Sequence, residues 1–323
     1  MILFFMFGVI IPVAVGITIV ATDCSDANRT EELDQAARVT GTTKAKKPPF
    51  IIWHYSGYRD KPESVEIALS SGLITHVNIQ GALHRKDRYY KKNANILKTI
   101  QIAKNYGAKI IWSRWLWPGY TVEDSNAKDL FDVNFYIKEI EALREEAKTF
   151  GADFTGLDTE PYARSPMVAY KDNRITLKPE DRQSLKLLIK QVVNSVGTVD
   201  FIYPAGWFGN TMPCDIIAEL GIFRVSEMTF YANYKRIKHI KVPYEIFGAY
   251  VNTTRENKNY PKLPYFTIAE IFDNSQLWSD KKGLFIYPLE NKAELIAKDL
   301  VKYSRKLSFA KLSEEDSNNP NRE

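Results

Sequence analysis

Short apolar runs alternate with longer stretches of helical periodicity along the chain from Phe50 onward. The runs are rich in β-branched and aromatic residues, as buried strands are, and the stretches between them repeat apolar residues near the 3.6-residue period of a helix. In residues 132–150, for example, Ile140, Leu143 and Ala147 recur on one face, and Gly151 ends the segment. The pattern predicts strands that alternate with helices, which is typical of a parallel sheet.

Eight of these runs are predicted as strands, with helices between most of them. The predicted strands are 50–57, 74–83, 109–117, 153–162, 200–207, 224–231, 246–252 and 283–289, and the predicted helices are 62–71, 94–106, 132–150, 179–195 and 292–306. Eight such units match a single α/β domain of the (β/α)₈ TIM-barrel type. An open doubly wound sheet is the alternative, but no glycine-rich dinucleotide fingerprint follows the first strand.

The chain on either side of the barrel, which we assign to residues 48–312, has a different character. Residues 1–22 carry no charge, the stretch from Met1 to Ala21 would span about 31 Å as a helix, and the segment is expected to be a signal peptide or membrane anchor. Residues 23–47 are polar and are expected to form a flexible linker, and residues 313–323 a disordered tail. These features predict a secreted, periplasmic or extracellular-facing membrane-anchored protein, with possible membrane attachment through residues 1–22.

Composition narrows the function classes. Apolar residues make up 45% of the chain and charged residues 26%, which is ordinary globular composition. The net charge of +5 is a small excess spread along the chain, so nucleic acid is not an expected partner. Two cysteines and four histidines argue against a disulfide framework and a multi-histidine metal centre, so we expect no metal and no cofactor.

Carboxylates gather at the end of the fourth predicted strand, Gly156-Leu157-Asp158-Thr159-Glu160-Pro161-Tyr162. Barrel enzymes carry their chemistry at the C-terminal ends of the strands, and the two-residue period places Asp158, Glu160 and Tyr162 on one side. Two close carboxylates resist double ionisation, so one keeps its proton and can act as a general acid in glycosidic bond cleavage. The alternative is structural, with these carboxylates in salt bridges to an arginine such as Arg114.

Aromatic and amide side chains at other strand ends add to this site. Flat rings beside hydrogen-bonding groups suit the apolar faces and hydroxyls of sugars, although some of the rings are expected to fill the core, Trp112 above all. The candidates for substrate binding are Tyr162, Trp115, Trp117, Trp207, Tyr203, Tyr231, Tyr250 and Tyr287, with Asn78 and Gln80 as amides that recognise hydroxyls. The expected partner is therefore a carbohydrate or glycoconjugate substrate.

The run around Asp158 and Glu160 resembles the signature of the family 18 chitinase-like glycoside hydrolases, in which spaced aspartates precede a catalytic glutamate. The resemblance implies a (β/α)₈ barrel, with the glutamate as proton donor. The preceding aspartate would orient the acetamido group of the substrate, which itself attacks the anomeric carbon. Weaker similarities follow at Glu227 to Tyr231, where the aspartate of the family's Met-x-Tyr-Asp run is absent, and at Tyr287, where chitinases often carry a tryptophan. Hyaluronidase-type barrels share the Asp-x-Glu pair.

Two alignments with that signature are open. When the chain is aligned on the final glutamate, Asp153, Asp158 and Glu160 match, and Gly156 replaces the middle aspartate. This first alignment implies an enzyme, and we prefer it because it keeps a carboxylate pair. When Phe154, Gly156 and Asp158 are aligned on the Phe-x-Gly-Ile-Asp core, Tyr162 takes the place of the acid. This second alignment implies a barrel that binds a glycan without cleaving it.

Other mechanisms use other residues. A retaining enzyme with a protein nucleophile would need a second carboxylate about 5 Å from the acid, for which Glu227 is preferred over Glu270 and Glu290. A lesser alternative is a barrel phosphodiesterase that uses the strand-end histidines His54 and His84 as acid and base.

Overall fold

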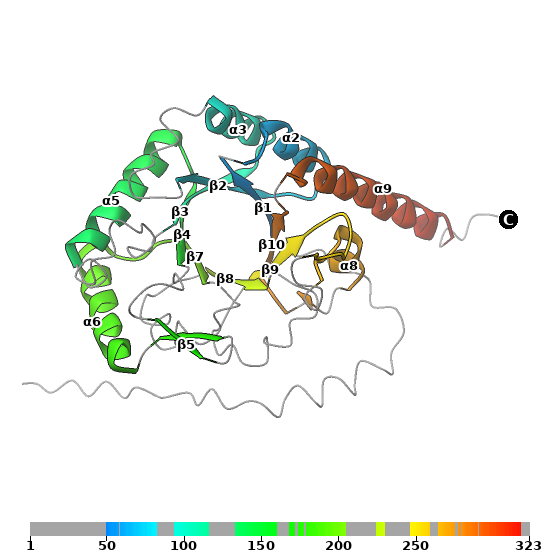
Figure 1. Ribbon diagram of the computed structural model, residues 1–323. Helices are drawn as coiled ribbons and strands as arrows, with labels where there is room; N and C mark the ends of the chain where they lie inside the picture. Colours follow the sequence, from blue (N-terminus) through cyan, green and yellow to red (C-terminus); the bar gives the residue numbers. More distant parts are fainter. Residues whose placement is uncertain are drawn as a thin grey trace, which may run out of the picture. The chain divides into compact units, whose positions relative to one another are not determined.

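Eight parallel strands form the centre of the fold. They are β1 (Phe50–Ser56), β2 (His76–Ala82), β3 (Lys109–Trp115), β4 (Phe154–Thr159), β7 (Phe201–Pro204), β8 (Arg224–Thr229), β9 (Ile246–Val251) and β10 (Gly283–Pro288). Each strand pairs with its neighbour in this order, and β10 pairs with β1, so the ring is closed (Figure 1). The parallel α/β fold predicted from the sequence is confirmed.

The computed structural model describes only part of the chain, and it lies within one compact unit, Lys44–Glu323. The described residues are 50–57, 59–82, 94–115, 133–159, 168–171, 174–177, 179–204, 224–229, 246–258, 264–274, 277–278, 280–289 and 291–317. The predicted leader and linker, residues 1–47, lie outside them. Residues 205–223, between β7 and β8, and residues 230–245, between β8 and β9, also lie outside them.

Helices lie outside the ring of strands (Figure 1). They are α2 (Pro62–Ser70), α3 (Ala94–Asn105), α5 (Val133–Phe150), α6 (Pro179–Val196), α8 (Ile268–Asp273) and α9 (Ala293–Ser317). Helix α2 begins with a proline, whose missing N–H costs nothing in the first turn. Helices α3 and α5 are followed by Gly107 and Gly151 at φ values of 67° and 60°, the left-handed geometry that glycine adopts without strain.

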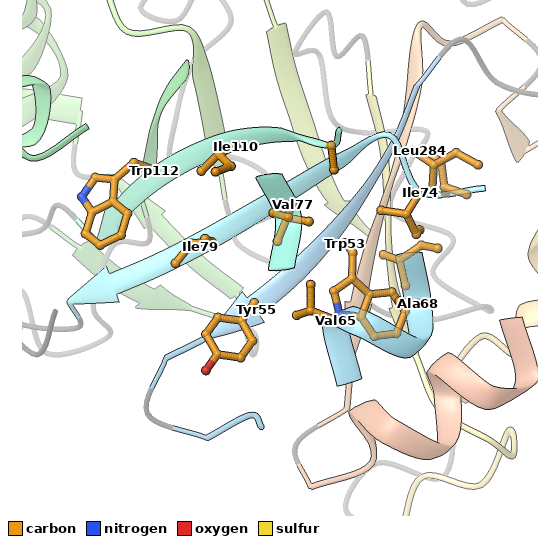
Figure 2. Close-up of a cluster of buried hydrophobic side chains, with 14 of the residues drawn as sticks. Trp53, Tyr55, Val65, Ala68, Ile74, Val77, Ile79, Ile110, Trp112 and Leu284 are labelled. Atoms are coloured by element: carbon orange, nitrogen blue, oxygen red, sulfur yellow. The ribbon is translucent and has the colours of Figure 1, made fainter. Parts of the chain in front are cut away.

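Side chains alternate between two cores, because successive residues of a strand face opposite sides. On β1, Ile51, Trp53 and Tyr55 belong to the outer cluster between the strands and the helices, and Figure 2 shows Trp53 beside Val65 and Ala68 of α2. The residues between them face the barrel interior. Its apolar floor is formed by Ile52, Ile111, Phe201, Ile246 and Phe285, with Phe50, Phe154 and Tyr287 packed against it.

Three elements differ from the sequence prediction. An antiparallel hairpin, β5 (Val168–Lys171) with β6 (Arg174–Leu177), lies between β4 and α6, and the short helix α8 follows β9. Helix α9 runs to Ser317, five residues into the predicted disordered tail, because residues 307–317 hold many helix formers and no glycine or proline. The sequence signal for the hairpin is weak, the turn-forming pair Asp172-Asn173 between two short runs, whereas α8 was readable from its capping-box residues Thr267 and Glu270.

Candidate functional site at the strand ends

Polar side chains replace the apolar floor toward the C-terminal ends of the strands. The same interior row that carries Ile52 on β1 continues to His54 and Ser56, and on β2 it carries Asn78 and Gln80. The row on β4 runs from Phe154 through Gly156 to Asp158. We call His54, Asn78, Gln80, Asp158 and Tyr287 the strand-end site. Its first four members are all at most 6% exposed.

Asp158 lies deep in this site. Its neighbours in the strand register are Trp115 on β3 and Tyr203 on β7. The Gln80 side chain donates a buried hydrogen bond from Nε2 to Asp158 Oδ2 at 3.5 Å, across from β2. The structure therefore brings together two residues that the sequence analysis had selected separately.

The structural alternative from the sequence was a salt bridge between Asp158 and Arg114, and the structure pairs Arg114 with other carboxylates. Arg114 pairs in register with Leu157, so it belongs to the opposite face of the sheet from Asp158. Its guanidinium lies 3.1 Å from Glu139 and 3.8 Å from Glu146, both on α5. The described contacts therefore place this buried cation in the outer layer, away from the interior row.

His54 is fixed between β2 and β10. Its Nδ1 lies 2.9 Å from Nδ2 of Asn78, and its ring stacks on Tyr287 with centroids 3.9 Å apart and planes 22° apart. Burial, together with the charge of Arg59, lowers the pKa of His54 to about 3. A histidine with that pKa is neutral at pH 7 and cannot supply a proton there, which argues against the acid role in the phosphodiesterase alternative. Its proposed partner, His84, lies outside the described residues.

Tyrosines continue the site along β10 and β9. Tyr287 lies 6.0 Å from Tyr250, and Tyr250 lies 5.9 Å from Tyr265, in each case between ring centroids. Tyr250 and Tyr287 are partly exposed, unlike the residues of the apolar floor. The sequence selected both tyrosines for sugar contact but did not identify Tyr265, which follows β9 and was predicted neither as strand nor as helix.

A tight turn closes the end of β1 beside Gln80. The Ser56 N–H donates to Asp60 Oδ2 at 2.9 Å, and the Asp60 N–H donates back to the Ser56 carbonyl at 2.9 Å. Gly57 N–H donates to the Gln80 carbonyl at 3.3 Å, which ties the turn to β2. Burial raises the pKa of Asp60 to about 6, against the opposing hydrogen bond from Ser56. Sequence reasoning missed Asp60, because nothing in the sequence marks a loop carboxylate as buried.

The alternative carboxylates take other positions. Glu270 accepts a hydrogen bond from the Thr267 N–H in the capping box of α8 and forms a salt bridge with Arg255 at 2.9 Å, so its role is to cap the N-terminus of α8. Glu227 pairs in register with Phe247, which belongs to the outer cluster. The residue before it, Ser226, pairs with Ile246 of the apolar floor, so the interior row of β8 runs through Ser226. This register does not bring Glu227 into the row of Asp158. Glu290 lies outside the described residues.

Several predicted site residues fall outside the described side chains. Trp115, Tyr203 and Glu227 are described as strand positions without their side chains, and the other site residues that lie outside the described part are Glu160, Tyr162, Trp117, Trp207 and Tyr231. Within the described ranges, no group of three or more His, Cys, Asp or Glu side chains could hold a metal ion. Among the helices named above, none is long and apolar enough to cross a membrane.

Solved structures with a similar fold include carbohydrate-active enzymes. The spore cortex-lytic enzyme SleL of Bacillus cereus matches with a TM-score of 0.50 at 10% identity, covering 79% of this chain and 74% of that one. A family 18 chitinase of Cycas revoluta, solved with (GlcNAc)4, matches with a TM-score of 0.49 at 12% identity, covering 79% and 99% of the two chains. An endo-β-N-acetylglucosaminidase of Cordyceps militaris matches with a TM-score of 0.44 at 10% identity, covering 85% and 94%.

Sequence comparisons add no relative. No protein-family model matches the chain, and no curated protein matches it. The similarity to SleL therefore shows a shared fold and nothing further about activity. The chain has a closed parallel α/β barrel fold of the kind found in SleL.

Proposed function

We propose that this protein is a glycoside hydrolase that cleaves a glycosidic bond at the C-terminal end of the barrel. Glu160 protonates the leaving oxygen. Asp158 orients either that acid or an acetamido group of the substrate, which then attacks the anomeric carbon. Tyr250 and Tyr287 contact sugar rings. The sequence places Glu160 two positions after Asp158, on the same side of an extended strand.

The observation that carries the proposal is the burial of Asp158 at the end of β4. A buried carboxylate is costly to keep unless its partners or its function require it. Asp158 is 6% exposed and receives a hydrogen bond from the neutral amide of Gln80, while the nearby Arg114 pairs with glutamates on the other face. Burial and the contact with Gln80 place this carboxylate at the C-terminal end of β4, where barrel enzymes carry their chemistry.

We place this activity outside the cytoplasm. The support is the sequence of residues 1–22, which are uncharged and mostly apolar over a membrane-spanning length as far as Ala21. The substrate would accordingly be an extracellular or cell-envelope glycan, and the anchor or signal would precede the linker at residues 23–47.

The test is turnover by the full-length protein. N-acetylglucosamine oligomers, chromogenic glycosides and polysaccharides are offered to the wild type, Glu160→Gln and Asp158→Asn. We expect at least one substrate to be cleaved by the wild type and both variants to lose roughly 10²- to 10⁴-fold in rate, as for the loss of a general acid. Asp200→Asn is the matched control, because Asp200 also contacts β4, through the N–H and hydroxyl of Thr155, but at the start of that strand.

Two results would contradict the proposal. If no substrate is cleaved but a glycan array binds the wild type and Glu160→Gln equally, the second alignment is correct and the barrel binds glycans without cleaving them. If Asp200→Asn loses as much turnover as Asp158→Asn, both effects reflect the stability of β4 and the assignment of Asp158 fails.

A further inference from the structure

His54 occupies an unusual position at the base of the strand-end site. It is 5% exposed and lies in the interior row of β1, directly after Ile52 of the apolar floor. The side-chain amide of Asn78 contacts Nδ1 of the His54 ring. Tyr287 stacks on the ring with centroids 3.9 Å apart, and the centroid of the Phe285 ring lies 6.0 Å away. A polar ring is thus built into an otherwise aromatic and apolar layer.

The contact with Asn78 determines which ring nitrogen carries the proton. The Asn78 side-chain NH₂ group can only donate, and it lies 2.9 Å from Nδ1 of His54. Nδ1 must therefore accept, and in a neutral ring the proton is on Nε2. Burial lowers the pKa of His54 to about 3, with the charge of Arg59 adding to the effect, so the ring is neutral across the physiological range.

The proton on Nε2 has no hydrogen-bond acceptor among the described residues. Nδ1 is used by Asn78, and the other described contacts of His54 are ring contacts with Phe285 and Tyr287. Nε2 stands at the far end of the imidazole from Cβ, so on an inward-facing side chain it points toward the barrel axis. A ring donor that makes no described hydrogen bond, in a site as enclosed as this one, favours an acceptor supplied by a ligand.

We propose that His54 is a ligand-binding residue whose Nε2–H donates a hydrogen bond to an uncharged acceptor oxygen, a hydroxyl or amide carbonyl, of a glycan bound at the strand-end site. Asn78 is the positioning residue that fixes the tautomer. This inference rests on the proposed function for the class of ligand. It gives His54 the role of a neutral donor, where the sequence suggested an acid or base.

Nuclear magnetic resonance of the imidazole nitrogens of the full-length protein tests the tautomer directly. The ¹⁵N signals of His54, assigned by their loss in His54→Phe, should show a neutral Nε2–H ring with no change between pH 5 and pH 8. A signal of the Nδ1–H tautomer, or titration of His54 within that range, would overturn the proposal. This readout does not depend on any enzymatic activity.

Binding of N-acetylglucosamine oligomers tests the ligand contact. The Nε2–H resonance should move when the oligomer binds, and His54→Phe, which keeps an aromatic ring beside Tyr287, should lose roughly five- to tenfold in affinity. The matched control is His76→Phe at the start of β2, where His76 meets Phe50 and Phe154 near the opposite end of the barrel. This control should bind as tightly as the wild type.

The outcomes separate this inference from the proposed function. If the oligomer binds the wild type and His54→Phe equally and leaves the Nε2–H resonance unmoved, the role of His54 is wrong while the glycan site stands. If none of the glycans of the panel binds or is cleaved, the proposed function fails and the ligand assigned to His54 fails with it.

Discussion

Strands β3 and β4 carry buried charged side chains on both faces, and the two faces use them differently. On the outer face, Arg114 meets Glu139 and Glu146 of α5, and Trp112 Nε1 donates to Glu146 at 3.1 Å. On the inner face, Asp158 receives its described hydrogen bond from the Gln80 amide. The outer charges neutralise one another, whereas the inner carboxylate accepts from a neutral group.

Burial alone therefore does not mark a functional residue in this barrel. Arg114 is 3% exposed and Asp158 is 6% exposed, so the two are equally inaccessible. What separates them is their position: Arg114 meets complementary charges on a helix, which favours a structural role, whereas Asp158 lies beside Gln80 at the strand ends, which favours a role toward a ligand. Three variants test this distinction by stability, in decreasing order of expected effect.

The largest effect is expected for Arg114→Met. The substitution keeps an apolar stem but leaves the buried Glu146 and the partly buried Glu139 of α5 without their cation, so we expect a loss of about 3–5 kcal/mol in the free energy of unfolding. Urea denaturation measures it. Lys98→Met, which removes the exposed pair with Glu63, is the matched control and should show no measurable loss. If Arg114→Met were as stable as the wild type, the ion pairs of Arg114 with Glu139 and Glu146 would not stabilise the fold. The proposed difference between the two faces would then be wrong.

A smaller and pH-dependent effect is expected for Asp60→Asn. Burial raises the pKa of Asp60 to about 6 from an ordinary value of 3.8, so the folded state holds this proton more tightly than the unfolded state. The resulting stability is complete below pH 4 and is lost as the pH rises through 6. Relative to the asparagine variant, the wild type should lose roughly 1–3 kcal/mol between pH 4 and pH 7. Parallel urea titrations at both pH values measure the difference.

An unchanged difference between pH 4 and pH 7 would show that Asp60 titrates normally. The asparagine of this variant keeps a side-chain oxygen that can accept from the Ser56 N–H, so the turn at the end of β1 stays intact and only the charge is tested.

The smallest effect is expected for Thr267→Ala in the capping box of α8. Thr267 accepts from the Glu270 N–H, and its loss should cost about 1 kcal/mol in the free energy of unfolding. Thr149→Ala on α5 is the matched control: its hydroxyl donates back to the Glu145 carbonyl within the helix, so alanine should be neutral or slightly stabilising there. Equal losses at both positions would argue against Glu270 as part of a cap and reopen it as a candidate nucleophile.

Much of the fold was predictable because its signals are local. All eight strands lie within the predicted ranges, and Gly107 and Gly151 end their helices as the sequence indicates. Trp112 is fully buried, as expected, because its strand alternates between the two cores. Asp158, Asn78, Gln80 and Tyr287 were selected from strand-end positions; Gln80 contacts Asp158, and Asn78 and Tyr287 contact His54. The assignments of Glu160 and the aromatic residues beyond the described part remain predictions.

The sequence by itself determined the order of the strands, the alternation of apolar residues and the carboxylates at the end of β4, because each depends on residues close together in the chain. The tertiary structure alone decided the partners. That Asn78 sets the tautomer of His54, that Gln80 reaches Asp158 and that Arg114 turns to α5 depend on strand register and on which face each residue takes. Closure of the barrel sets those distances, since it brings β10 beside β1 and so places Tyr287 against His54 from opposite ends of the sequence.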